Sequence, residues 1–176
     1  TETTSLNARN ARLVGISLAR NVGKAWYIPV GHLDSQENLA IGQLSADAVK
    51  AAVAPLLLSD QVLKIGHNLK YDITVFKQQW GLDFGGRSAD TLIAAYLTES
   101  GDRSLKLDDL CQARGLRLTS FSEATGNDKR ENCFAYVDIE KAGHYSCEDV
   151  YGALVLWQEF SLLLKEKGLE ELFWRV

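Results

Sequence analysis

The segment Val62-Leu63-Lys64-Ile65-Gly66-His67-Asn68-Leu69-Lys70-Tyr71-Asp72 gives the strongest indication of the fold. Its first five residues have the composition of a short strand, which leads directly into the polar pair that follows. From Leu69 onwards the apolar residues recur at steps of three and four, which is typical of one helix face: Ile73, Phe76 and Trp80. The stretch therefore predicts a strand followed at once by a helix, with Asp72 in the first turn.

Segments on both sides of this stretch predict an α/β fold with a mixed sheet flanked by helices. Residues 13–18 and 25–30 have the composition of strands, and the turn at 21–24 indicates that they form a hairpin. A helix capped by Ser45 should follow. Later helices are expected to start at Ser88, to cover residues 105–112 and to run from Asp138 to Leu164, with irregular structure over residues 119–134. The chain 1–176 is expected to form a single domain.

Composition and charge narrow the class of protein. The chain has 176 residues, of which 46% are hydrophobic, so it can bury a proper core. With a formal net charge of -4, the chain lacks the overall positive charge that is typical of nucleic-acid-binding proteins. An acidic protein can nevertheless hold phosphates through bound cations. Cys111, Cys133 and Cys147 lack paired spacing, which favours free thiols in a reducing compartment.

The ends and the hydropathy of the chain suggest where it works. There is no run of about 20 apolar residues and no signal-peptide pattern, so we expect a cytoplasmic protein that does not enter a membrane. The chain lacks an initiator Met and opens directly on an acidic motif. We therefore expect it to be a fragment of a longer polypeptide.

Three acidic residues lie far apart in the sequence, each near the end of an expected strand or on an expected helix: Glu2, Asp72 and Asp149. Divalent cations need oxygen ligands that converge from several elements, so this arrangement favours metal-assisted phosphodiester chemistry. Other interpretations stay open for each residue. Glu2 could be a solvated surface group or a helix cap, and Asp72 could stabilise the helix dipole. Asp149 could form a structural hydrogen bond with Tyr145, which lies four residues earlier on the same helix face.

Three short motifs connect the chain to a known family. Thr1-Glu2-Thr3, Asn68-Leu69-Lys70-Tyr71-Asp72 and Tyr145-x-x-x-Asp149 resemble the motifs of the proofreading 3′–5′ exonuclease domain of bacterial-type (family A) DNA polymerase I, in the tyrosine branch of the DEDD superfamily. The resemblance covers essentially the whole chain. The middle motif is specific, whereas the other two are common by chance. The resemblance implies a ribonuclease H-like fold.

The resemblance also implies a mechanism. Glu2 and Asp149 would ligate the first of two Mg²⁺ or Mn²⁺ ions, and Asp72 would help to hold the second through water. Tyr145 would orient the attacking water. The reaction would release nucleoside 5′-monophosphates from single-stranded or frayed DNA 3′ ends, next to a covalently attached polymerase domain.

Substrate contacts follow from the same resemblance. Leu6 matches the family's wedge against the terminal bases, and Phe121 matches the aromatic residue that packs on the 3′ end. For these two residues ordinary core packing is the alternative. Asn68, Tyr71 and Arg103 match positions that contact the terminal phosphates and sugars.

Two departures from the family pattern leave alternatives open. The family's first motif is Asp-x-Glu, and its Asp would stand immediately before Thr1, so the chain could belong to an impaired enzyme or a silent scaffold for a polymerase. An RNA-trimming exonuclease of the ribonuclease D type is a further alternative. His144 also fits the histidine branch of the superfamily, but Tyr145 shares the face of Asp149, so His144 is expected to be exposed.

Overall fold

The structure is a computed structural model that describes residues 1–99 and 104–175. In these residues the strands are β1 (Glu2–Thr3), β2 (Leu13–Asn21), β3 (Lys24–Pro29), β4 (Lys64–Gly66) and β5 (Ser88–Asp90). Helices fill most of the rest: α1 (Ala46–Leu58), α2 (Leu69–Trp80), α3 (Thr91–Thr98), α4 (Leu107–Gln112), α5 (Phe121–Thr125), the 3₁₀ turn η1 (Cys133–Tyr136), α6 (Ile139–Glu166) and α7 (Glu170–Arg175). The predicted α/β class is confirmed.

The strands form two small sheets. In the first, β1, β2 and β3 pair antiparallel, and the predicted hairpin at residues 21–24 is confirmed. In the second, β4 pairs parallel with β5, from Lys64 opposite Ser88 to Gly66 opposite Asp90. Antiparallel and parallel pairs are therefore both present, as expected of a mixed sheet, but they are divided between two sheets.

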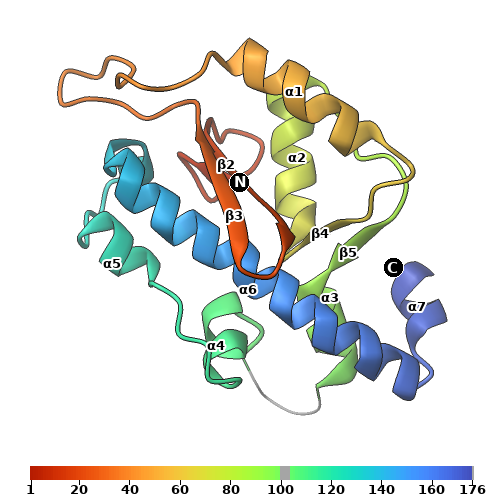
Figure 1. Cartoon of the computed structure of the whole chain (residues 1–176). Coiled ribbons are helices and arrows are strands. Elements are labelled where there is room, and N and C mark those ends of the chain that lie inside the picture. Colours follow the sequence, from red (N-terminus) through yellow and green to blue (C-terminus); the bar gives the residue numbers. More distant parts are fainter. Residues whose placement is uncertain (100–103, 176) are drawn as a thin grey trace.

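Helix α6 joins the parts of the core. It crosses the middle of the molecule, passing the β2–β3 hairpin with its first half and α3 with its second half (Figure 1). Its first half packs into a cluster around Val14 and Phe134, and its second half, through Leu156 and Phe160, into a cluster with α3 and α4. A third cluster lies between the hairpin, α1 and α2. The helix thus carries the residues of its first turns against the sheet that holds β1.

Two expectations for the middle of the chain are wrong. Ser88 does not start a helix, because residues 88–90 pair with β4 as a strand and Asp90 then caps α3 through a hydrogen bond from Leu92 N. Residues 119–134 are not irregular throughout. A capping box between Ser120 and Glu123 starts α5, since Ser120 Oγ accepts from Glu123 N while Glu123 Oε2 accepts from Ser120 N.

Other local expectations are confirmed. Ser45 caps α1 by accepting from Ala48 N, and Asp138 caps α6 by accepting from Glu140 N and Lys141 N. The three cysteines are free, and Cys111 and Cys133 are buried. Among the described residues, none of the helices combines the length and the apolar composition that a bilayer span requires.

Candidate active site

Glu2 connects the first strand to the long helix. It stands opposite Gly15 in the β1–β2 pair, and its Oε1 accepts a hydrogen bond of 2.8 Å from the buried Ser146 Oγ of α6. Burial raises the pKa of the Glu2 carboxyl, because desolvation disfavours the charged form. A strand residue and a helix residue from opposite ends of the chain therefore meet at one carboxylate.

Asp72 brings α2 to the same region. It lies in the first turn of α2, and its Oδ1 accepts from the nitrogen of Thr1 at 2.8 Å and from Thr1 Oγ1 at 2.6 Å. These two bonds join the start of α2 to the start of β1. Asp72 thus has a hydrogen-bond partner outside its own helix. Stabilisation of the helix dipole alone would not require such a partner.

Asp149 and Tyr145 supply the contribution of α6. Asp149 Oδ1 is buried and has no hydrogen-bond partner within the described part of the chain. Burial, followed by the negative charges of Glu2 and Asp108, raises the pKa of Asp149 to about 8. Burial and the neighbouring Asp149 likewise raise the pKa of the Tyr145 phenol well above its ordinary value, so this hydroxyl stays neutral.

The three acids act on one another. The charge of Asp72 helps to raise the pKa of Glu2, and the charge of Glu2 helps to raise the pKa of Asp149. Negative charge from β1, α2 and α6 therefore accumulates in one region. A site of this kind disfavours additional negative charge and favours a cation.

The chemistry of the donors suits a hard divalent cation, since every candidate ligand is a carboxylate oxygen. The unpartnered Oδ1 of Asp149 is an acceptor that a cation could satisfy. Across residues 1–99 and 104–175, however, no group of three or more His, Cys, Asp or Glu side chains is already arranged as a metal centre. The donors thus fit such an ion in kind.

The residues expected to contact substrate differ in their surroundings. Leu6 is 97% exposed on the loop after β1, which excludes core packing as its role. Asn68 is exposed, and its backbone has a left-handed φ of 62°. Tyr71 is half-buried, and its hydroxyl donates to the carbonyl of Ser5 and also forms a hydrogen bond with Thr3 Oγ1. Tyr71 therefore holds the segment that presents Leu6.

Phe121 stands beside Tyr145. It is 48% exposed, stacks on Phe134 with ring centroids 6.0 Å apart, and meets the Tyr145 ring edge-on at 6.3 Å. As expected, His144 is exposed. A hollow of about 480 Å³ opens next to Tyr145 and is lined by Thr119, Glu123, Asp138, Glu140, Lys141, His144 and Tyr145. Arg103 lies outside the described residues.

Two residues of this region carried no signal in the sequence analysis. Ser146 donates to Glu2, but a single serine inside a helix is common, and only its place beside Tyr145 and three residues before Asp149 could have pointed to it. Asp108, near the start of α4, helps to raise the pKa of Asp149. Its membership of the region depends on how α4 packs against α6, which the local sequence does not reveal.

Comparison with known proteins adds a family and a fold. A family model described as 3′–5′ exonuclease matches residues 1–165. DNA polymerase I of Pseudomonas aeruginosa is 33% identical over 171 residues, which cover 93% of this chain and 18% of that protein. DNA polymerase I of Chloroflexus aurantiacus is 34% identical over 181 residues, which cover 100% of this chain and 18% of that protein. The chain therefore spans less than a fifth of the length of these relatives.

Solved structures show a similar fold. NrnC of Brucella melitensis superimposes with a TM-score of 0.74 at 21% sequence identity, over 98% of this chain and 75% of that one. The same protein with bound Mg²⁺ gives a TM-score of 0.70 at 20% identity, over 98% and 74% of the two chains. At this level of identity the likeness concerns the fold, and the expected ribonuclease H-like architecture is confirmed.

Proposed function

The chain belongs to the 3′–5′ exonuclease family, and we propose that it hydrolyses the terminal phosphodiester of single-stranded or frayed DNA 3′ ends, releasing nucleoside 5′-monophosphates in proofreading. The observation that carries the proposal is the convergence of acids from three elements. Asp149 Oδ1 of α6 is buried without a partner in the described chain, Glu2 of β1 accepts from Ser146 of the same helix, and Asp72 of α2 accepts from Thr1 Oγ1 next to Glu2. A solvated surface acid or a simple helix cap would not need such convergence.

Two divalent cations, Mg²⁺ or Mn²⁺, are the proposed cofactors. Glu2 and Asp149 would hold one ion, with Asp149 Oδ1 as the available oxygen, and Asp72 would help to hold the other. When bound, such ions supply an activated water and neutralise charge on the departing oxygen. The Mg²⁺-bound form of NrnC supports this choice by analogy of fold alone.

Tyr145 is proposed to place the attacking water. Because burial keeps its phenol neutral, the hydroxyl can both donate and accept a hydrogen bond and needs no charge for this role. Its neighbour Phe121 presents about half of its surface to solvent, so it can stack against the last base. Leu6 is exposed for a wedge between bases, and Asn68, Tyr71 and Arg103 would contact the terminal phosphates and sugars.

The context of the chain is also part of the proposal. The curated relatives are whole DNA polymerases I, and the matched region is under a fifth of each. We therefore propose that a covalently attached polymerase domain is its partner, that it binds DNA ends as single strands, and that it works in the cytoplasm.

The test is a comparison of aspartate substitutions on α2 and just beyond it. Asp72→Asn keeps an oxygen that can accept from Thr1 but removes the negative charge, whereas Asp83→Asn alters an exposed acid that pairs with Lys77 on the surface. We expect Asp72→Asn to reduce release of the last nucleotide from a 3′-labelled oligonucleotide about a thousandfold, and Asp83→Asn to change it little. Undiminished degradation by a folded Asp72→Asn variant would refute the assignment. Much faster decay of a matched RNA would refute the choice of DNA.

A further inference from the structure

The side chain of Tyr27 lies between two glycines, one on the sheet and one on α6. A Cβ atom added to Gly15 of β2 would stand 2.1 Å from the Tyr27 hydroxyl oxygen, so the ring occupies the space that any side chain there would need. A Cβ atom added to Gly143 of α6 would lie 3.6 Å from Tyr27 Cβ, which is ordinary van der Waals contact. The sheet and the helix therefore approach each other across this one ring.

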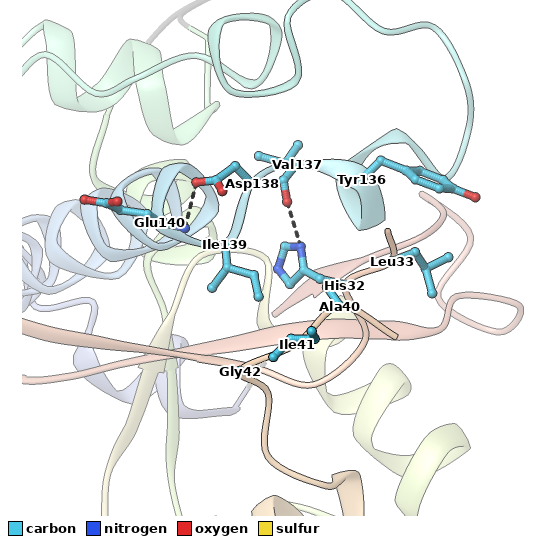
Figure 2. A pocket seen from close by; sticks show the side chains of 10 residues that line it. All are labelled: His32, Leu33, Ala40, Ile41, Gly42, Tyr136, Val137, Asp138, Ile139 and Glu140. Atoms are coloured by element: carbon cyan, nitrogen blue, oxygen red, sulfur yellow. Dashed lines mark hydrogen bonds between the residues drawn. The ribbon is translucent and has the colours of Figure 1, made fainter. Parts of the chain in front are cut away.

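A pair of hydrogen bonds through His32 joins Tyr27 to Val137, the residue before the cap of α6. His32 Nδ1 lies 2.9 Å from the carbonyl oxygen of Val137, and His32 Nε2 lies 2.6 Å from the Tyr27 hydroxyl. Because a carbonyl can only accept, Nδ1 carries the proton, so Nε2 of the neutral ring accepts from Tyr27. His32 is buried, and Figure 2 shows its bond to Val137 on the wall of a hollow. We refer to Tyr27, His32 and the two bonds as the Tyr27–His32 link.

The link is connected to the proposed water-placing residue, Tyr145, along the chain and through Phe134. Val137 precedes Asp138, the cap of α6, and Tyr145 follows about two turns later. The ring of Phe134 contacts both partners, with centroids 6.2 Å from His32 and 5.6 Å from Tyr145. The start of α6 and the ring that packs on Tyr145 are thus both held by the same buried histidine.

We infer that Tyr27 and His32 are positioning residues for Tyr145, which they hold in place through Phe134 and the first turn of α6. The inference rests on the proposed function for its catalytic meaning. A buried polar pair surrounded by aromatic rings fixes direction as well as distance, because its hydrogen bonds are satisfied in only one arrangement. Loss of the link should therefore misplace Tyr145 without removing any group that touches substrate.

The first experiment is a double-mutant cycle on the link. Tyr27→Phe keeps the ring and loses the hydroxyl, while His32→Asn can keep a donor near Val137 but lacks the nitrogen that accepts from Tyr27. We expect each variant to lower kcat about tenfold with KM changed less than about twofold, because misplacing a catalytic group costs turnover rather than binding. In the double variant kcat should fall no further than in either single variant, since all three proteins lack the hydrogen bond between Tyr27 and His32.

One matched control changes a residue that contacts Tyr27, and the other changes a tyrosine on the surface. Gly143→Ala touches Tyr27 from the helix side at ordinary contact distance and should leave kcat unchanged. Tyr96→Phe removes a hydroxyl from a side chain that is 71% exposed and should also be silent. Losses in the two link variants that simply add in the double variant would overturn the inference, as would an unchanged kcat in Tyr27→Phe.

A second readout does not depend on activity. In protein labelled with ¹³C at the tyrosine rings, the Tyr145 signals can be assigned by their disappearance in Tyr145→Phe. We expect Tyr27→Phe and His32→Asn to shift or broaden these signals while the signals of Tyr96 stay in place. Unmoved Tyr145 signals in both folded variants would overturn the inference. If the unmodified protein degrades neither DNA nor RNA, the proposed function fails, and the Tyr145 signals still decide whether the link positions that ring.

Discussion

Asp90 and Asp149 are both shielded from solvent, but the structure surrounds them differently. The two oxygens of Asp90 accept from three backbone nitrogens, those of Asn68 and Leu69 at 2.8 Å and that of Leu92 at 2.9 Å. Asp149 has a buried oxygen without a partner in the described chain. The first carboxylate is fully used by the fold, whereas the second retains an unused acceptor. This difference separates an acid that stabilises from one that is available for chemistry.

The largest expected effect is on catalysis at Asp149. Asp149→Asn keeps the shape of the side chain but removes the charge that a cation would require, so we expect nucleotide release to fall about a thousandfold, equivalent to about 4 kcal/mol of transition-state stabilisation. A 3′-labelled oligonucleotide followed at saturating Mg²⁺ measures this. Full activity of the variant would remove Asp149 from the proposed site and end the contrast with Asp90.

The next largest effect is on stability at Asp90. Asp90→Ala leaves the backbone nitrogens of Asn68, Leu69 and Leu92 without an acceptor. The loss of these bonds at the starts of α2 and α3, next to a buried side chain, should cost about 3 kcal/mol of unfolding free energy. Urea denaturation followed by circular dichroism measures it. Asp90→Asn retains one acceptor oxygen, so its unfolding free energy should lie between those of Asp90→Ala and the unmodified protein. An Asp90→Ala protein as stable as the unmodified one would show that these bonds are replaced by water.

The third expected effect is a gain in stability, at Asp149. The pKa of Asp149 is raised to about 8, above the value of about 3.9 expected in the unfolded chain, so the folded protein binds more protons between these pH values. The contribution of this group to stability therefore falls as pH rises from about 4 to about 8.

Because Asn does not ionise, Asp149→Asn should raise the unfolding free energy by about 1 to 3 kcal/mol near pH 8 and by little near pH 4. Thermal melts of the two proteins across this range, without added metal, measure the difference. Added Mg²⁺ should stabilise the unmodified protein near pH 8 and should have little effect on the variant. Destabilisation by Asp149→Asn at high pH would mean that the carboxylate is already satisfied.

The smallest effect is expected at the exposed ring next to the site. Phe121→Ala removes a stacking surface for one base, so KM for a single-stranded oligonucleotide should rise severalfold, corresponding to about 1 kcal/mol, with kcat changed less. Phe121→Leu tests whether an apolar side chain suffices without stacking. A large fall in kcat with unchanged KM would instead assign Phe121 to the support of Tyr145, which its ring also contacts.

The local elements could be predicted where a periodic pattern or a cap marks them. The passage from β4 to α2, the hairpin and the start of α6 at Asp138 all follow from such signals. The strand at Ser88-Ala89-Asp90 could not be predicted, because the same residues can cap a helix or form a strand, and pairing with β4 decides between the two. The five residues of α5 are too few for a periodic pattern, although their capping box was present in the sequence.

The candidate site could be predicted only in part. Asp72 and Asp149 could be predicted from motifs and helical spacing, but the interaction of both carboxylates with Glu2 depends on contacts between distant elements. The helix expected to start at Ser88 is capped by Asp90, but the bonds of Asp90 to the backbone at the start of α2 could not be predicted. The residue type of Asp90 and its sequence neighbours do not reveal whether backbone nitrogens donate to both carboxylate oxygens or leave one without a partner.

The length of α6 has a consequence for how the protein unfolds. Its 28 residues extend for about 42 Å, and no break separates the half that packs on the hairpin from the half that packs on α3. Neither half of the core can melt without fraying the helix that the other half needs. Hydrogen exchange in the middle of α6 should therefore proceed only through global opening, in one cooperative unit.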